Sequence, residues 1–161
     1  MCDLPADPQL ESFGARFAVP GISEKGYVNT EIFVESPGGH SSVPPPHTTI
    51  GLLALIIVHL EKNPYPAHLT RTSPLYALFQ CQAEHAPDFP IELKEVLEES
   101  LESDEALRLA EELIFASEGG YSIRVQLSTT QAVVIIEGGV KVNALPEQAS
   151  AFVNQRIATE R

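Results

Sequence analysis

The chain has 161 residues, which suffice for one domain with a sizeable core but not for two ordinary domains. A hydrophobic fraction of 43% and a charged fraction of 20% are typical of a globular protein and argue against disorder throughout. The formal net charge of −12 argues against nucleic acid as a partner, because nucleic-acid binding relies on clustered lysine and arginine.

The sequence predicts neither a secretory signal nor a membrane anchor. Residues 1–24 lack a basic start followed by an apolar segment, and we expect them to be a linker or the remnant of another domain. The longest apolar run, Ile50–Leu60, is shorter than the roughly 20 residues that span a bilayer. Cys2 and Cys81 have no metal-binding spacing, and reduced thiols fit an intracellular setting. These features predict a cytoplasmic location by default.

The first predicted element is a half-buried strand over residues 25–35. Val28, Ile32 and Val34 alternate on one face, and Tyr27 lies on the other. The segment that follows, Ser36–Pro44, contains His40 among two glycines and two prolines, so it predicts a turn. Judged locally, a solvated turn histidine is the simpler interpretation of His40.

A helix is predicted next, from Thr48 or Thr49 to about Lys62. Three consecutive prolines at 44–46 require an extended approach, after which a threonine hydroxyl can cap the helix. The helix is apolar nearly all round, so we expect it to be buried across a sheet.

Residues 63–127 are predicted to form a helical insertion. Three helices are predicted within it, at residues 75–84, 91–101 and 104–117. Ser103 is the expected cap of the last helix, and the glycine pair at 119–120 its terminator. Residues 92–118 contain ten acidic and two basic residues, a pattern typical of a solvated helix face.

Two further strands are predicted, at residues 128–137 and 149–158, with Asn143 in the short connection between them. The order strand, helix, helical insertion, strand, strand predicts an α+β fold. Such a βαββ unit is one helix and one strand short of the ferredoxin-like βαββαβ arrangement. Because the missing pieces would leave a sheet edge exposed, we expect the isolated chain to be marginally stable or self-associating.

No motif for self-contained catalysis is present. The chain lacks a Walker loop, a dinucleotide-binding fingerprint, a His-Glu-x-x-His helix and a nucleophile elbow. Its five histidines include no pair at the spacing of helical zinc ligands, so no metal ligand is predicted. Ser41 or Ser42 beside His40 makes a poor nucleophile–base pair, because sequence neighbours rarely achieve the geometry and no third member is apparent.

Three residues suit the binding of an anion or a polarised carbonyl group, namely His40, Asn143 and Arg156. Histidine and asparagine can donate hydrogen bonds to a developing oxyanion, and arginine can bind a carboxylate through two parallel hydrogen bonds. Taken singly, each has a simpler explanation as a solvated histidine, a turn former or a surface arginine.

Several separated motifs occur in a characteristic order. They are Gly39-His40-Ser41-Ser42 with Val-Pro-Pro-Pro-His-Thr after it, Gly138-Gly139-Val-Lys-Val-Asn143-Ala-Leu-Pro-Glu147, and Val153-Asn-Gln-Arg156-Ile157. In these motifs the chain closely resembles carboxypeptidase S and its relatives among the dizinc exopeptidases and aminoacylases. The resemblance covers most of the chain. It implies that residues 25–161 are a lid, or dimerisation, domain with its insertion at about 63–127, and that residues 1–24 are a linker or remnant of the catalytic domain.

The resemblance implies a role for each of the three candidates. In the family, the histidine of the Gly-His-Ser motif reaches an active site, in dimers that of the partner subunit, and hydrogen-bonds the scissile carbonyl oxygen; this role falls to His40. The family's asparagine and arginine help to bind the terminal carboxylate of the substrate, and they match Asn143 and Arg156. Gln155 stands where relatives often have histidine, which is a departure next to Arg156.

The resemblance also implies two zinc ions in the full-length family, but their ligands and the general base belong to motifs that this chain lacks. We therefore expect the lid portion of a zinc-dependent hydrolase of peptide or N-acyl amino acid bonds next to a free C-terminal carboxylate, inactive as this fragment and self-associating or homodimeric. The alternative is a non-catalytic dimerisation or interaction remnant. Full-length relatives are vacuolar or secreted, in contrast to the default location above.

Overall fold

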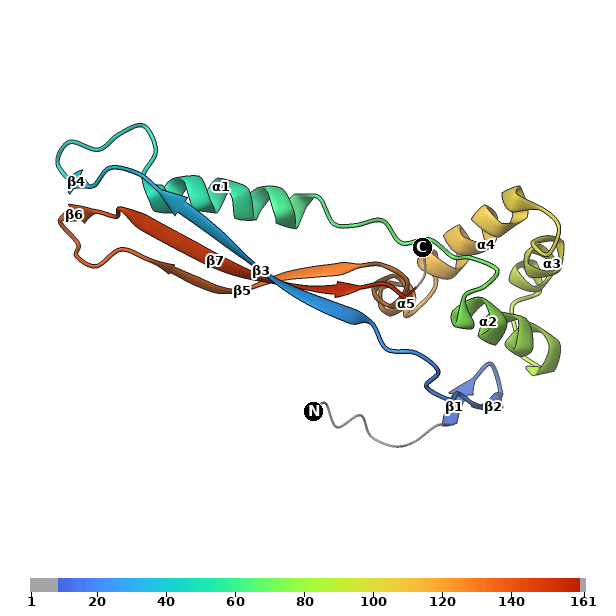
Figure 1. The fold of residues 1–161 in the computed structure, drawn as a ribbon. Coiled ribbons are helices and arrows are strands. Elements are labelled where there is room, and N and C mark those ends of the chain that lie inside the picture. Colours follow the sequence, from blue (N-terminus) through green and yellow to red (C-terminus); the bar gives the residue numbers. More distant parts are fainter. Residues whose placement is uncertain (1–8, 160–161) are drawn as a thin grey trace. The chain divides into compact units, whose positions relative to one another are not determined.

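The computed structural model describes residues 9–159 and has an α+β fold (Figure 1). The chain divides into two compact units. The sheet unit consists of residues 25–66 and 128–158, and the helical unit holds residues 9–24 and 67–127. No helix among the described residues is long and apolar enough to cross a membrane.

The sheet unit is built on three antiparallel strands in the order β3-β7-β5. Strand β7 (Gln148–Ile157) is central, with β3 (Gly26–Glu35) and β5 (Thr130–Gly138) at the two edges. Helix α1 (Thr49–Lys62) lies along one face of this sheet (Figure 1). The sheet unit is therefore a single layer of strands covered on one side by one helix.

The core of the sheet unit lies between α1 and the middle of the sheet. Its buried members are Leu53 from α1 and two alanines of β7, Ala149 and Ala151. The small alanine side chains let the backbone of α1 approach the central strand, while Ile32 and Val34 of β3 close the side of this cluster. The period-2 pattern predicted for β3 is confirmed at these two residues, which are the less exposed ones along the strand, but Val28, predicted to lie on the same face, is 43% exposed.

The N-terminus of α1 is tied to both neighbouring segments. The Thr48 hydroxyl accepts from the backbone N–H of Gly51 at 3.1 Å, as expected for a capping threonine. The buried Thr49 hydroxyl donates to the carbonyl of Pro146 at 2.6 Å and contacts the Ser36 hydroxyl. These contacts join the start of the helix to the ends of β3 and β7.

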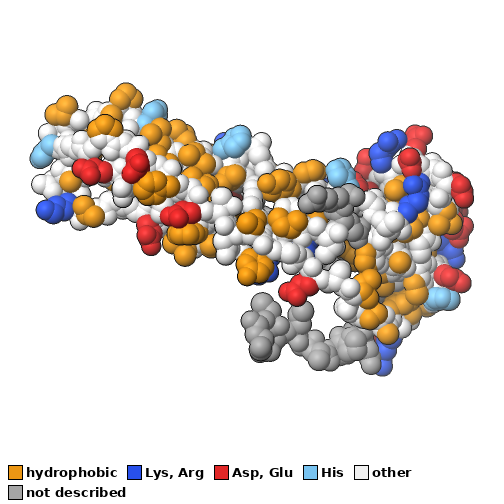
Figure 2. Space-filling view, viewed as in Figure 1, with side chains coloured by type: hydrophobic (Ala, Val, Ile, Leu, Met, Phe, Trp, Pro, Cys, Tyr) orange, Lys and Arg blue, Asp and Glu red, His pale blue; other side chains and the backbone are white. Residues whose placement is uncertain are grey.

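The outer face of α1 corrects one prediction. We expected this helix, which is apolar nearly all round, to be buried across a sheet, but Leu55 is 56% exposed and Val58 47% exposed. Figure 2 shows hydrophobic side chains on the surface over this helix. The prediction was wrong for this face because a helix on a single sheet buries only the stripe that meets the strands.

Two short strands, β4 (Gly39–His40) and β6 (Ala144–Leu145), pair with each other beyond the main sheet. The sequence did not predict them, because two residues are too short to show a period.

At the other end of the unit, the Lys25 ammonium donates to the carbonyl of Ser128, and burial lowers the pKa of this lysine.

The helical unit begins with a hairpin of β1 (Gln9–Ser12) and β2 (Ala15–Ala18). Four helices follow after the first part of the sheet unit, and they are α2 (Pro74–His85), α3 (Ile91–Glu99), α4 (Asp104–Ala116) and α5 (Gly120–Leu127). The sequence predicted α2, α3 and α4 to within two residues at each end, but it did not predict the hairpin or α5. Gly120, expected to terminate a helix, instead begins α5.

The helical unit has its own apolar core, which includes Leu97 and Ile114. The Phe13 ring packs edge to face on Phe89 with centroids 4.8 Å apart, so the β1–β2 hairpin belongs to this unit. The cap predicted for α4 is confirmed, since the Ser103 hydroxyl accepts from the N–H of Ala106 at 3.2 Å.

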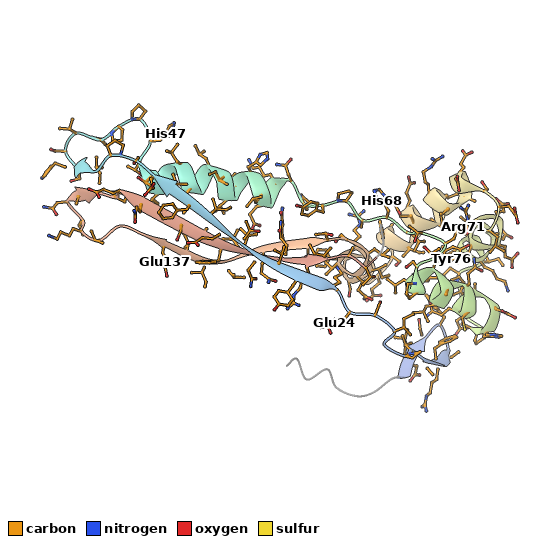
Figure 3. The ribbon with its side chains drawn as sticks, in the orientation of Figure 1. Glu24, His47, His68, Arg71, Tyr76 and Glu137 are labelled. Atoms are coloured by element: carbon orange, nitrogen blue, oxygen red, sulfur yellow. The ribbon has the colours of Figure 1, made fainter. Side chains whose placement is uncertain are left out.

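A polar network joins the segment before α2 to the turn between α3 and α4 (Figure 3). The Arg71 guanidinium donates to the carbonyl of Ser100 and to the Asp104 carboxylate, both at 2.7 Å. The buried Tyr76 hydroxyl lies 2.8 Å from the Ser100 hydroxyl. Most acidic residues of this unit are exposed around the core, as the predicted solvated face requires.

Candidate functional site

The pairing of β4 with β6 brings two of the three candidate residues together. His40 lies opposite Ala144 in this pair, and the backbone N–H of Ser41 donates to the carbonyl of Asn143 at 3.2 Å. Both candidates lie at the end of the sheet unit where β3 ends and β7 begins, since the N–H of Ser36 donates to the carbonyl of Glu147 at 3.0 Å. Asn143 lies in a turn, as the sequence predicted.

Two glycines lie where these two chain segments approach each other. A Cβ atom on Gly38 would lie 2.7 Å from the Glu147 side chain, and one on Gly39 would lie 3.2 Å from Cδ1 of Leu145. A larger residue at either position would require the side chain of Glu147 or Leu145 to shift. The two glycines thus leave room for these side chains beside the β4 segment.

The His40 imidazole is exposed and is held by its own turn. Its Nδ1 atom lies 2.8 Å from the Ser42 hydroxyl oxygen, and the backbone N–H of Ser42 donates to Nδ1 at 3.2 Å. The turn is closed by the N–H of Val43, which donates to the carbonyl of His40 at 3.1 Å. The contacts described for this ring thus involve Nδ1, which leaves Nε2 facing away from Ser42.

Arg156 lies at the opposite end of the sheet. It stands on β7 opposite Tyr27 of β3, and its guanidinium carbon lies 5.4 Å from the centroid of the Tyr27 ring. Arg156 lies eight positions along β7 from Gln148, a span of roughly 26 Å at about 3.3 Å per residue. The structure therefore does not bring Arg156 together with His40 and Asn143 within one copy of the chain.

Three valines surround the His40 end with exposed apolar surface. Val43 is 79% exposed, and Val140 and Val142 are 92% and 103% exposed. All three lie within three residues of His40 or Asn143 in the chain. Single exposed apolar residues are ordinary, whereas here three such residues lie near two candidate site residues in the chain.

Neither a metal centre nor a nucleophile is assembled in the described part of the chain. No group of three or more His, Cys, Asp or Glu side chains there could hold a metal ion. His68 lies 3.9 Å from the Glu111 carboxylate, and His47 stands on the loop between β4 and α1 (Figure 3). The Ser42 hydroxyl contacts the His40 ring, and a nucleophile–base pair would also require a third group that orients this ring. No carboxylate in the described part of the chain contacts it.

A model of the peptidase dimerisation domain matches residues 22–161 of this chain. The chain belongs to this family. Among the relatives of this dimerisation domain, carboxypeptidase S of Saccharomyces cerevisiae is 40% identical over 140 residues, which are 87% of this chain and 24% of the relative. An uncharacterised carboxypeptidase of Schizosaccharomyces pombe is 37% identical over 92% of this chain and 23% of its own length.

A human relative, named N-fatty-acyl-amino acid synthase/hydrolase PM20D1, is 33% identical over 94% of this chain and 28% of its own length. The dimerisation domain thus spans about a quarter of the length of the curated relatives that it matches. No solved structure gives a significant match. The family resemblance seen in the sequence is confirmed, and with it the assignment to a peptidase and hydrolase family.

Two residues of the site were not singled out from the sequence. Ser42 was weighed only as a nucleophile, whereas its contacts are with Nδ1 of His40 on the inner side of a turn. Tyr27 was noted only as one of the residues on the second face of its strand, and its place beside Arg156 depends on the register of β3 with β7. Register between strands distant in sequence is not readable from either strand alone.

Proposed function

We propose that this dimerisation domain is the lid of a zinc-dependent, carboxypeptidase S-like metallopeptidase that hydrolyses peptide or N-acyl amino acid bonds next to a free C-terminal carboxylate. Residues 25–161 form the lid, with an insertion at about 63–127, and residues 1–24 are a linker or a remnant of the catalytic domain. The names of the relatives, which are carboxypeptidases and N-fatty-acyl-amino acid synthases/hydrolases, support this class of substrate.

The topology supports a ferredoxin-like lid. In a βαββαβ unit the third strand lies between the first and the second, and here β7 lies between β3 and β5, with α1 connecting β3 to the rest of the unit. The remaining strand of such a unit would pair with the free edge of β3, and the remaining helix would cover the exposed flank of α1. The exposure of Leu55 and Val58 agrees with this arrangement.

Each candidate has a chemical task in this proposal. His40 donates from Nε2 to the scissile carbonyl oxygen as negative charge develops there. Asn143, held next to the β4 turn, and Arg156 bind the substrate carboxylate, for which a guanidinium offers two parallel hydrogen bonds. The two zinc ions of the full-length family would be bound outside this chain, and we propose no residue of it as their ligand.

The observation that carries the proposal is the register of β7. It separates Arg156 from the His40 end by roughly 26 Å, which is too far for one small substrate to touch both. If both act on one substrate, they come from two copies of the chain. In a twofold dimer each site then receives His40 and Asn143 from one subunit and Arg156 from the other.

Mixed dimers of the full-length enzyme test this arrangement. His40→Asn and Arg156→Gln should each inactivate the homodimer. His40→Asn is chosen because the asparagine side-chain oxygen can still accept from the N–H of Ser42 and preserve the turn, while the shorter side chain cannot place a donor where Nε2 of the histidine lies. When the two variants are co-expressed, each mixed dimer should regain one of its two sites.

The outcomes separate the possibilities. Activity in mixed dimers, absent from both homodimers, supports a site shared between copies. Absence of activity in mixed dimers that are shown to form would mean that His40 and Arg156 do not meet across the dimer. Full activity of His40→Asn in the homodimer would remove His40 from the proposed chemistry. Lys141→Gln, on the exposed tip beside Asn143, is the matched control and should stay active.

A second candidate function is a non-catalytic interaction module. The edge of β3 that pairs with no described strand and the exposed apolar flank of α1 favour it, because both can bind another copy without any chemistry. Hydrolytic activity distinguishes the two functions. An interaction module has no hydrolytic activity in any longer form of the protein, and it retains its self-association when His40 is replaced.

A further inference from the structure

The turn that carries His40 makes two contacts with one atom of its ring. Nδ1 lies 2.8 Å from the Ser42 hydroxyl oxygen and 3.2 Å from the Ser42 backbone nitrogen. The turn itself is held by the hydrogen bond from the N–H of Val43 to the carbonyl of His40, and the N–H of its second residue, Ser41, donates to the carbonyl of Asn143. The backbone N–H of Ser42 is thus held beside Nδ1 by the hydrogen bonds of the turn.

The two contacts have different chemical meanings. A backbone N–H can only donate, so Nδ1 accepts this hydrogen bond through its lone pair. In the neutral ring the proton is then on Nε2. A hydroxyl can either donate or accept, so the Ser42 side chain is compatible with both tautomers and contributes mainly to the orientation of the ring.

We infer that Ser42 is a positioning residue for His40: its backbone N–H selects the tautomer protonated on Nε2, and its hydroxyl holds the ring so that this N–H points away from the turn. This inference rests on the proposed function for its purpose, because an outward Nε2–H is the donor that a developing oxyanion needs. Ser41, whose backbone N–H binds Asn143, has no such contact with the ring among those described.

The tautomer is measured on the chain itself with ¹⁵N-labelled histidine, by two-bond ¹H–¹⁵N correlation at about pH 8.5, two units above the ordinary histidine pKa of about 6.5. His47, on the neighbouring exposed loop, is the internal reference. Because one hydrogen bond shifts an equilibrium by roughly two- to tenfold, the ratio of Nε2–H to Nδ1–H should be higher at His40 than at His47 by about that factor. An equal or lower ratio at His40 would overturn the inference.

Substitutions at Ser42 test the second contact. Ser42→Ala should increase the picosecond-to-nanosecond mobility of the His40 ring in ¹³C relaxation. In Ser42→Thr, which keeps the hydroxyl, the ring mobility should equal that of the unsubstituted chain. Ser41→Ala is the matched control and should leave the ring unchanged. Unaltered ring mobility in Ser42→Ala would overturn the role of the hydroxyl.

In the full-length enzyme, Ser42→Ala should lower kcat while KM changes little, because the oxyanion contact is made in the transition state. Ser42→Thr should recover kcat. The tautomer and mobility readouts require no activity, so they can succeed even if the enzyme proposal fails. Conversely, loss of activity in His40→Asn together with an unselected tautomer would retain the proposed function and overturn the role of Ser42.

Discussion

The guanidinium carbon of Arg156 lies 5.4 Å from the centroid of the Tyr27 ring, across the pairing of β7 with β3. Tyr27 is one of the more exposed large side chains of the sheet unit, so Arg156 rests on an aromatic surface without being buried by it. The contact holds the arginine against the sheet while its hydrogen-bond donors remain available to an anion.

A double-mutant cycle measures this contact. Tyr27→Leu, Arg156→Met and the double variant should give a coupling energy of about 0.5–1 kcal/mol in urea unfolding, the size expected for an exposed cation–π pair. Tyr27→Phe keeps the ring and should retain most of the coupling. Strictly additive effects of the two substitutions would show that the pair has no energetic role.

The core under α1 predicts that replacing one leucine lowers the stability strongly, whereas replacing a second leucine of the same helix changes the stability little. Leu53 is fully buried, so Leu53→Ala should destabilise the sheet unit by about 2–5 kcal/mol. Leu55 is 56% exposed, and Leu55→Ala should change stability by no more than about 0.5 kcal/mol. Amide hydrogen exchange of β7 reports on this unit directly; similar effects of the two substitutions would contradict the packing described.

The exposed surfaces of the sheet unit predict self-association of the chain. The edge of β3 is free among the described strands, and the flank of α1 exposes Leu55 and Val58. Sedimentation velocity should therefore show a weight-average mass that rises with protein concentration. Leu55→Glu with Val58→Glu should weaken the association if the helix flank takes part. A sharp monomer at every concentration would count against this prediction.

Zinc binding and hydrolysis are predicted to be absent from the chain as it stands. Since no described cluster of His, Cys, Asp or Glu could hold a metal, the purified chain should take up less than one zinc ion per molecule and should not cleave blocked dipeptides. Elemental analysis after dialysis and a peptide hydrolysis assay measure both. Stoichiometric zinc with turnover that is lost in His40→Ala would require a catalytic centre within this chain.

The sequence predicted the long elements well and the short ones poorly. Strand β3, helix α1 and helices α2 to α4 begin and end within two residues of the predicted bounds, because their periods and caps are local properties. Strands β4 and β6 and the hairpin before them in the chain are two to four residues long, and such lengths show no period. The exposed flank of α1 was missed because an all-round apolar helix does not reveal how many layers cover it.

The sequence by itself determined the family, the α+β class and the identity of the three candidates, since these depend on residue types and their order along the chain. Only the tertiary structure shows which of these three residues lie close together. Pairing of β4 with β6 joins His40 to Asn143 across about a hundred residues of chain, whereas the register of β7 carries Arg156 to the far end of the sheet. The physical reason is that strand pairing and register depend on hydrogen bonds and side-chain packing between segments that are distant in the sequence. The residue pattern of one strand does not identify its partner.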